Sequence, residues 1–576
     1  MKKNLKKLSA LLLALALSVS VTACGSNTAS TTTAAAETTA ESTEATEATG
    51  TSANGFTVQL GSNPETLDPA LNSAIDGANT LITVFEPLLL IDENNEVVPG
   101  QADLPEVSED GLTWTFTMKD GLKWSDGSDL TAKDFEYSFK RLACPDTAAP
   151  YGETVVGMID GYQDAIGNPD ADGNTTTDPD WDALNVHASE DGKTLTIQLA
   201  YPCSYFDKLC AFAAMSPVQQ ATVEANGDAW CTQPDTYVCN GPYMITDWVP
   251  SERIVLSKNP NYVGGWDTSK IVSDTITLLL LEDSSAAYAA YNSGEAQLVK
   301  DVPTDEIPSL TKAEDGGDFY VDTILSTYYI SLNDQKEPFT DPKVRKALSL
   351  AIDRDYVANT IMQGTYTPAY NLVGPGIVDE TGMFYDNANG GKTYISDDYE
   401  ANLEEAKQLM ADAGYADGFD IECSVSPGLL NSTDVVQAIA SQLAQIGINV
   451  TIKQEDSATQ RDEIGAGTVA PLFLQGLGGP YCDINLIASI GFTEGARYCT
   501  WVSPEFMDLA SQAASEMDAE KRVALYSQMQ QMMVDEAPAL WLYQQDTLYA
   551  YNSKKVQNWT ARTDEVVLMD GVSVAG

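Results

Sequence analysis

VQAIASQLAQIGINVTI, residues 436–452, changes its hydrophobic period at a single glycine. Its apolar residues first lie three or four positions apart, at Val436, Ile439, Leu443 and Ile446. They then alternate with polar residues, at Ile448, Val450 and Ile452. The first spacing lines one face of a helix, the second lines one face of a strand, and Gly447 between them is typical of a helix end. This helix-glycine-strand pattern predicts an α/β fold.

The segments around this stretch extend the prediction. A second core-facing helix ends at Gly414, with apolar residues at Leu403, Ala406, Met410 and Ala413. In the first half of the chain, residues 113–118 and 193–199 alternate with period two around Asp-Gly turns. That pattern predicts strands, so we expect a β-rich region in the first half.

The charge of the chain excludes several classes of function. It has 84 acidic and 31 basic residues, for a net charge of −53. Such a surface repels duplex DNA and anionic lipid, so we expect no nucleic-acid partner. His187 is the only histidine, which excludes multi-histidine zinc sites. A Ser/His/Asp or Cys/His hydrolase would need His187, which we interpret as a surface residue in a strand and turn.

The first residues have the pattern of an export signal. Four lysines, at positions 2, 3, 6 and 7, precede an apolar stretch over 8–21, which is short for a membrane-spanning helix. Val-Thr-Ala-Cys at 21–24 resembles a bacterial lipobox. We therefore expect cleavage before Cys24 and a diacylglycerol on its thiol.

A tether is predicted between this cysteine and the folded body. Residues 25–54 contain only Ser, Thr, Ala, Glu, Gly and Asn, with no large apolar side chain to bury. A flexible segment of that length spans about 30 Å. No later segment approaches 18 consecutive apolar residues. We expect an extracytoplasmic body that contacts the membrane only through the lipid.

Eight cysteines follow Cys24, an even number that permits four disulfides in an exported chain. Cys231 with Cys239 and Cys482 with Cys499 are the preferred local pairs. Buried free thiols are the alternative, because cysteine also behaves as a small apolar side chain.

An acidic loop over 170–180 partly resembles a calcium-binding loop. Asp170, Asp172 and Asn174 occupy the first ligand positions, but Thr175 and Trp181 replace the required glycine and glutamate. A solvated loop is favoured, and calcium binding stays open.

Several motifs spread along the chain carry a family resemblance. In order, they are KWSDG at 123–127, LTAKDF at 130–135, CNGPY at 239–243, FTDPKVRKAL at 339–348 and IDR at 352–354. Together they resemble the oligopeptide-binding and dipeptide-binding family of ABC-importer solute receptors. The resemblance runs from about Phe56 to Trp559, nearly the whole mature chain.

The resemblance implies a hinged, two-lobed α/β receptor of the periplasmic-binding-protein type, with an extra β-rich subdomain in the first lobe. The ligand of such a receptor lies between the lobes, and no bond is broken. We therefore predict no catalytic residue, no cofactor and no metal. We expect a signal peptide at 1–23, a tether at 24–54, the first lobe at 55–99, 206–325 and 541–576, the inserted subdomain at 100–205, and the second lobe at 326–540.

The resemblance also implies a ligand site. Peptide-binding relatives pair an aspartate with the α-ammonium of the ligand, and Asp483 falls at the matching position. Asn240 and Gly241 fall where backbone approaches the ligand. The remaining candidates are tyrosines near positions that line the cleft: Tyr151, Tyr328, Tyr329, Tyr481 and Tyr543.

Two departures limit what the resemblance implies. Ser326 stands where oligopeptide-binding relatives have a cysteine bridged to the region of Cys482, so that bridge cannot form. Leu477 stands where they place a basic residue for the carboxylate of the peptide. Ligand length and recognition of a free C-terminus are therefore left unspecified.

These features predict a monomeric receptor that captures peptides for an ABC importer. Its expected partners are the peptide and the permease and ATPase complex. Non-peptide cargo, such as a metal chelate, haem or an oligosaccharide, is the nearest alternative. Peptide sensing without transport, and a secreted hydrolase that uses paired carboxylates, are further alternatives.

Overall fold

The computed structural model describes residues 55–169, 175–300, 302–303, 305–371, 378–379, 382–383, 394–426, 432–478, 483, 492, 499–569 and 571–574. The described residues belong to one compact unit. Its framework is a single mixed sheet of eleven strands. Along the sheet these strands are β17 (Ile448–Gln454), β16 (Phe419–Val425), β18 (Leu472–Gly478), β12 (Phe319–Leu332), β19 (Ala539–Tyr551), β11 (Leu298–Lys300), β1 (Gly55–Gly61), β10 (Thr275–Leu280), β9 (Arg253–Lys258) and β8 (Tyr243–Val249), with β13 (Thr367–Pro368) paired to β19.

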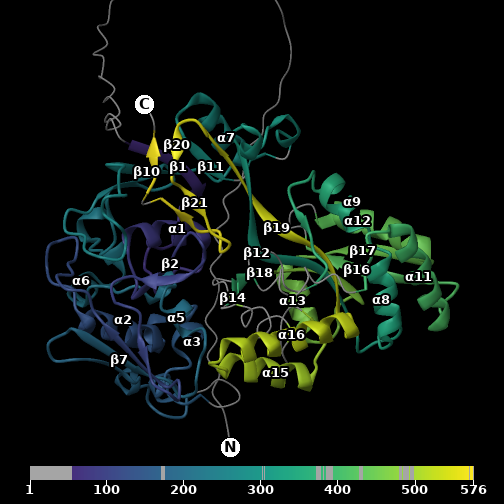
Figure 1. Ribbon diagram of the computed structural model, residues 1–576, viewed down its shortest axis with the longest axis horizontal. Coiled ribbons are helices and arrows are strands. Elements are labelled where there is room, and N and C mark those ends of the chain that lie inside the picture. Colours follow the sequence, from purple (N-terminus) through teal and green to yellow (C-terminus); the bar gives the residue numbers. More distant parts are fainter. Residues whose placement is uncertain are drawn as a thin grey trace, which may run out of the picture. The chain divides into compact units, whose positions relative to one another are not determined.

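The two longest strands, β12 and β19, lie at the centre of this sheet and run side by side (Figure 1). They pair antiparallel from Phe319 opposite Ala550 to Ser331 opposite Ala539. Near the Ser331 end of β12 and the Ala539 end of β19, alternate residues of the two strands belong to two different hydrophobic cores. The larger core surrounds β1, β8, β9 and β10, and the smaller core surrounds β16, β17 and β18. Two cores joined by continuous strands are the architecture of a two-lobed α/β protein.

The helices predicted in the second half are present. α11 (Tyr399–Asp412) buries Leu403, Ala406 and Met410 against the smaller core, and α12 (Ser432–Leu443) buries Val436, Ile439 and Leu443. A 3-10 turn extends α12 to Ile446, and β17 begins at Ile448. Gly447 between them has a φ of +84°, a conformation that glycine adopts without the steric penalty of other residues. The helix-glycine-strand prediction is confirmed.

The strands predicted in the first half form a separate four-stranded antiparallel sheet. Its order is β4 (Glu106–Val107), β5 (Thr113–Thr117), β7 (Thr194–Gln198) and β6 (Val186–Ala188). α2 (Ala132–Ala143) packs against it and begins with a capping box between Thr131 and Asp134. The only histidine, His187, is exposed on β6, as predicted.

The remaining helices and strands are shorter or lie outside both sheets. The helices are α1 (Ile75–Val84), α3 (Gly152–Val156), α4 (Tyr162–Ala165), α5 (Phe206–Leu209), α6 (Gln220–Asn226), α7 (Ser284–Ser293), α8 (Pro342–Leu350), α9 (Arg354–Tyr356), α13 (Ser457–Gly465), α15 (Pro504–Ser515) and α16 (Ala519–Glu536). The strands are the pairs β2 (Leu89–Ile91) with β3 (Val97–Pro99), β14 (Val378–Asp379) with β15 (Gly382–Met383), β20 (Val556–Gln557) with β23 (Ser573–Val574), and β21 (Thr560–Ala561) with β22 (Val567–Leu568).

One preferred disulfide is wrong. Cys231 and Cys239 are both buried free thiols. The Cys231 thiol contacts the carbonyl of Asp228 at 3.9 Å, and the Cys239 thiol contacts that of Tyr243 at 3.6 Å. Both side chains fill the larger core as small apolar groups, which was the alternative. Cys482 lies outside the described residues.

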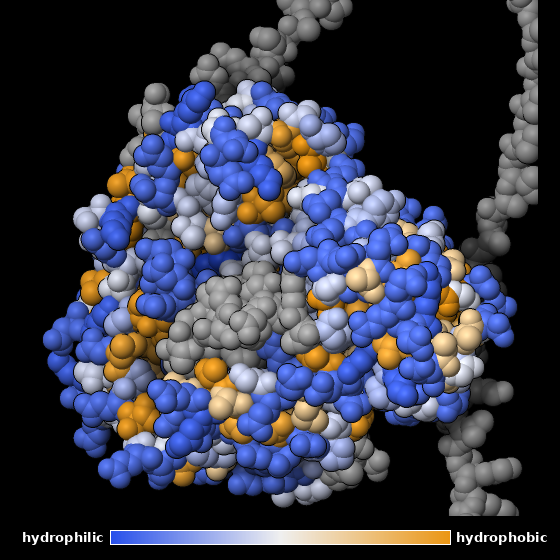
Figure 2. Space-filling model, turned by 45° about the vertical axis from the view of Figure 1, so that its right-hand side comes forward, coloured by the Kyte–Doolittle hydropathy of each residue, from blue (hydrophilic) through white to orange (hydrophobic). Residues whose placement is uncertain are grey.

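The visible face of the molecule is mainly hydrophilic, with apolar side chains in small separate groups (Figure 2). This agrees with the acidic composition. None of the described helices combines the length and the apolarity that crossing a bilayer requires.

Candidate functional site

The site is centred on a change of register between β12 and β19. Thr323 pairs with Asp546, but the next pair is Thr327 with Gln544. Residues 324–326 of β12 are therefore opposite a single residue of β19. A bulge of this kind interrupts the ladder and turns neighbouring side chains in new directions.

A cavity of about 320 Å³ adjoins this bulge. Leu325 and Ser326 line it, together with Gly478 at the end of β18. Tyr151 and Lys208 contribute to its wall from the first half of the chain. Its volume is near the lower end of the range for small-molecule sites.

Gly478 is required for the close approach of β18 to the bulge. It pairs with Ser326, and a Cβ at Gly478 would lie 2.9 Å from the carbonyl oxygen of Leu325. A side chain there would push β18 away from β12 or fill the cavity.

Asp483 is buried beside this cavity between two cations. Lys208 Nζ lies 2.8 Å from Asp483 Oδ2, and Arg522 Nη2 lies 2.7 Å from both Oδ1 and Oδ2. The side chains of Asp483 and Arg522 are 1% and 2% exposed, whereas that of Lys208 is 15% exposed. Lys208 lies within the short helix α5, and Arg522 lies in the first turn of α16. The carboxylate thus joins three segments that are far apart in the sequence.

The two cations keep Asp483 ionised. Burial by itself would raise the pKa of this carboxyl, but the charges and hydrogen bonds of Lys208 and Arg522 hold it well below its usual range. Burial likewise opposes the charge of Lys208, yet the carboxylate of Asp483 raises the pKa of its ammonium above the ordinary value. Both partners are therefore charged at neutral pH.

The other charged residues on the cavity wall are also paired. Arg562 Nε donates to Asp564 Oδ1 at 3.1 Å, and Lys300 Nζ lies 2.7 Å from Glu565 Oε2. The cavity wall therefore carries several charged side chains, each paired with a side chain of the opposite charge.

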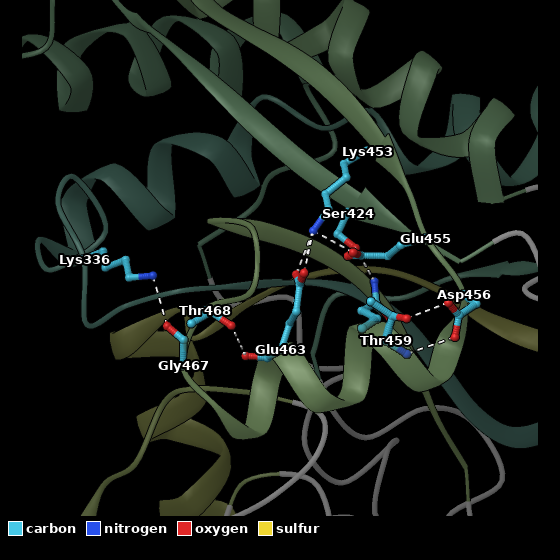
Figure 3. Close-up of polar contacts among 10 residues, drawn as sticks. Lys336, Ser424, Lys453, Glu455, Asp456, Thr459, Glu463, Gly467 and Thr468 are labelled. Atoms are coloured by element: carbon cyan, nitrogen blue, oxygen red, sulfur yellow. Dashed lines mark hydrogen bonds and ion pairs between the residues drawn. The ribbon is translucent and has the colours of Figure 1, made fainter.

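A polar network occupies the carboxyl ends of the parallel strands β16 and β17 (Figure 3). The Ser424 hydroxyl donates to Glu455, and Lys453 Nζ lies 2.6 Å from Glu455 Oε2 and 2.7 Å from Glu463 Oε2. Carboxyl ends of parallel strands commonly face ligands. Here the ammonium of Lys453 is shared between two glutamates, so it is not an open site for the carboxylate of a peptide.

Of the five candidate tyrosines, Tyr151 is the one that the structure places on the cavity wall, edge-on to Phe212 at 5.2 Å between ring centroids. Tyr328 and Tyr543 stack on each other at 5.2 Å, and Tyr329 packs against Trp541 at 5.3 Å. Those three lie on β12 and β19 and are not among the described residues that line the cavity. Tyr481 lies outside the described residues, as does Cys24.

Asn240 and Gly241 lie elsewhere and pack against the segment that follows α1. Asn240 is fully buried, and its amide accepts from Glu86 N at 3.0 Å and donates to Glu86 O at 2.8 Å. A Cβ at Gly241 would lie 2.5 Å from the carbonyl carbon of Val84. The observed contacts of both residues are with the protein backbone, and their role toward a ligand stays a prediction.

Sequence reasoning missed the two cations of the Asp483 cluster. Arg522 lies on the buried face of α16, four residues before Tyr526, followed at helical spacing by Met529 and Met533. A charged residue on an otherwise apolar helical face requires a buried partner, and this signal was available. Lys208, between Phe206 and Leu209, is likewise a charged residue close to apolar ones, but the apolar pattern around it is shorter.

No group of three metal-ligating side chains occurs among the described residues. Asp170, Asp172 and Asn174 of the acidic loop lie outside the described residues, so calcium binding by this loop stays open.

Comparisons with known proteins place these features in a wider context. Residues 96–492 match the model of the middle part of the bacterial extracellular solute-binding proteins, family 5. The chain is 32% identical over 509 residues to the periplasmic oligopeptide-binding protein of Salmonella typhimurium strain LT2, covering 87% of this chain and 88% of the relative. It is also 29% identical over 490 residues to a probable deoxycholate-binding periplasmic protein of Escherichia coli K12, covering 84% of this chain and 86% of that protein.

The fold is similar to that of a solved receptor. The unliganded open form of the periplasmic murein tripeptide-binding protein aligns with a TM-score of 0.76 at 27% identity, covering 90% of this chain and 97% of the other.

Proposed function

Because the chain belongs to family 5 of the bacterial extracellular solute-binding proteins, we propose that it captures peptides between its two lobes and delivers them to an ABC permease. The observation that carries this proposal is the cavity at the bulge of β12, next to a buried and ionised carboxylate. No chemical step is part of the function, and closure over the ligand supplies the signal that the permease recognises.

Asp483 and Tyr151 are the proposed ligand contacts in this cavity. A buried carboxylate selects an ammonium because leaving either charge unpaired in a closed site is costly. A tyrosine offers apolar area and a hydroxyl to variable side chains. Tyr328, Tyr329, Tyr543, Asn240, Gly241 and Tyr481 are further proposed ligand contacts, and the family resemblance alone supports them.

We further propose that the receptor is a lipid-anchored monomer outside the cytoplasm. Cys24 would carry the lipid, and residues 25–54 would act as the tether. The lipobox-like sequence and the tether composition support this assignment.

Non-peptide cargo is the second candidate. A protein that is 29% identical over most of the chain is named for deoxycholate, a ligand without an ammonium. The balanced charges of the cavity wall do not by themselves demand a peptide.

Native mass spectrometry distinguishes these candidates. Residues 55–576 would be purified from cells grown in peptide-rich medium and sprayed under non-denaturing conditions. A ladder of bound masses that fragment as peptides is the expected result. A single bound mass of another chemistry, or protein that stays empty with peptide mixtures, would reject peptide capture and leave the fold unchanged.

A further inference from the structure

The two cations around Asp483 differ in how firmly they are held. Arg522 is 2% exposed, and its guanidinium lies over the Tyr526 ring at 5.2 Å from the centroid. Its Nη2 is also 3.3 Å from the Tyr526 hydroxyl and 2.7 Å from both oxygens of Asp483. Arg522 is therefore fixed on the inner side of the carboxylate by several contacts at once.

Lys208 is more exposed than Arg522 and borders the cavity. Its ion pair with Asp483 is at 2.8 Å, and its side chain is 15% exposed. Asp483 itself is not among the described residues that line the cavity. Anything that enters the cavity therefore meets the lysine before it meets the aspartate.

A lysine in this position can leave. Its ammonium is a compact, strongly hydrated charge on a flexible stem, and the cavity gives it a route to water. The carboxylate of Asp207, the preceding residue, also helps to raise the pKa of Lys208, so it partly offsets the charge of the ammonium after displacement. Arg522 would still hold Asp483 after the lysine has moved.

We propose that Lys208 is a built-in substitute for the ammonium of the ligand, and that peptide binding exchanges one ammonium for another at Asp483 Oδ2. This inference rests on the proposed function. The exchange leaves the net charge of the cluster unchanged, so a ligand with a free amino terminus enters without creating a buried unpaired charge. A ligand without an ammonium leaves Lys208 in place and gains nothing from Asp483. Asp483 therefore supplies the preference for primary amines, whereas Lys208 lowers the affinity for them and lets the site accept ligands without an ammonium.

The alternative is that Lys208, Asp483 and Arg522 form a structural triad that only joins α5 to α16. Removal of the lysine would then weaken folding and would not improve binding of any ligand. The two interpretations predict opposite changes in affinity, which makes them separable.

The test compares Lys208→Met with Lys208→Arg in the full chain, solubilised in detergent and stripped of bound ligand. The probes are alanine peptides of three to five residues, and the same peptides with an acetylated amino terminus. Isothermal titration gives each affinity, and native mass spectrometry confirms occupancy. Lys140→Met is the matched control, because Lys140 is 13% exposed, pairs with Glu136 at 2.8 Å and does not line the cavity.

Lys208→Met is expected to bind the free peptides about tenfold more tightly than the wild type, because no internal ion pair has to be broken first. The acetylated peptides should show no gain. Lys208→Arg keeps a cation and should not gain affinity, and Lys140→Met should match the wild type. An unchanged or weaker affinity of Lys208→Met for the free peptides would overturn the proposal, and so would an equal gain for the acetylated peptides.

The outcome also separates this inference from the proposed function. If the wild type binds the peptides and Lys208→Met does not improve on it, the exchange is rejected while peptide capture stands. If no variant binds any peptide by either method, both the exchange and peptide capture are rejected.

Discussion

Arg522 places a single guanidinium nitrogen, Nη2, 2.7 Å from each of the two carboxylate oxygens of Asp483. The contact ties α16 to Asp483, and it is almost completely shielded from water. A buried carboxylate in this setting contributes to stability as well as to binding. The two contributions can be measured separately.

Asp483→Ala should weaken both folding and peptide binding. The loss of the carboxylate leaves Lys208 and Arg522 without their shared counter-ion, which we expect to lower the free energy of unfolding by about 3–5 kcal/mol. Affinity for alanine peptides with a free amino terminus should fall at least about tenfold, because their ammonium loses its partner. Urea unfolding and isothermal titration give the two quantities.

Asp68→Ala is the matched control for this change. Asp68 is 2% exposed and makes a two-point ion pair with Arg141, at 2.9 Å between Oδ1 and Nη1 and 2.5 Å between Oδ2 and Nη2. It does not line the cavity, so its loss should lower stability and leave the affinity of the folded protein unchanged. Equal losses of affinity in both variants would refute the role assigned to Asp483.

Glu86 should make the protein more stable in mild acid than in mild base. Its carboxyl is fully buried and accepts from Gln101 Nε2 at 3.0 Å and from Gly265 N at 2.6 Å. Burial outweighs these contacts and raises its pKa to about 7. Because the folded pKa lies above the unfolded value, the stabilising effect is complete below pH 4.5 and is lost as the pH rises through 7.

We expect the free energy of unfolding to increase by about 2.5 kcal/mol between pH 8 and pH 5 from this group alone. Urea unfolding at several pH values measures the change. Glu86→Gln should remove this part of the pH dependence, whereas Glu190→Gln, at an exposed position, should leave it intact. A pH profile that is the same in all three proteins would contradict the assignment.

The sequence predicted the parts of the fold that depend on local periodicity. α11, α12 and β17 follow directly from the spacing of Leu403, Met410, Val436 and Ile448. The pairing of β12 with β19 does not follow in the same way, because it joins residues more than 200 positions apart and no local pattern specifies the register. The bulge that forms the cavity is a property of that register and was not predictable.

The candidate site shows the same limit of sequence reasoning, and the ligand roles of its residues stay predictions. The resemblance selected Asp483 and Tyr151, and the structure places both at or beside the cavity. It did not reveal Lys208, because the pairing of α5 with Asp483 is a tertiary contact over 275 positions. The resemblance also selected Asn240, but a polar residue next to a glycine suits a ligand contact and a backbone contact equally. In the structure its side-chain amide bonds the backbone of Glu86.

Cys24→Ser should release the receptor from the membrane. The thiol is the proposed attachment point of the lipid, and serine cannot form the thioether. Growth with a radiolabelled fatty acid should label the wild type and not the variant, and fractionation should move the variant to the soluble or uncleaved pool. Cys144→Ser, in the body of the protein, should leave both labelling and location unchanged. Label that persists in Cys24→Ser would reject the anchor.

Gly418→Ala should strongly destabilise the second lobe, because Gly418 lies against Gly447 where β16 and β17 begin. A Cβ at Gly418 would lie 1.8 Å from the carbonyl oxygen of Gly447, and Gly418 also has a φ of +72°. The left-handed conformation alone costs alanine about 1–2 kcal/mol. The overlap with backbone requires the turn before β16 to separate from the turn before β17, which breaks the packing that aligns these strands.

Gly414→Ala isolates the two effects. Gly414 has a φ of +86°, and no atom lies within 4 Å of the position that a Cβ would take, so alanine there meets the conformational strain without the overlap. In urea unfolding, Gly414→Ala should lose about 1–2 kcal/mol, and Gly418→Ala should lose clearly more. If the two losses are equal, the close approach of Gly418 to Gly447 does not hold the strands together, and the register of β16 with β17 must be maintained by the side chains of the smaller core instead.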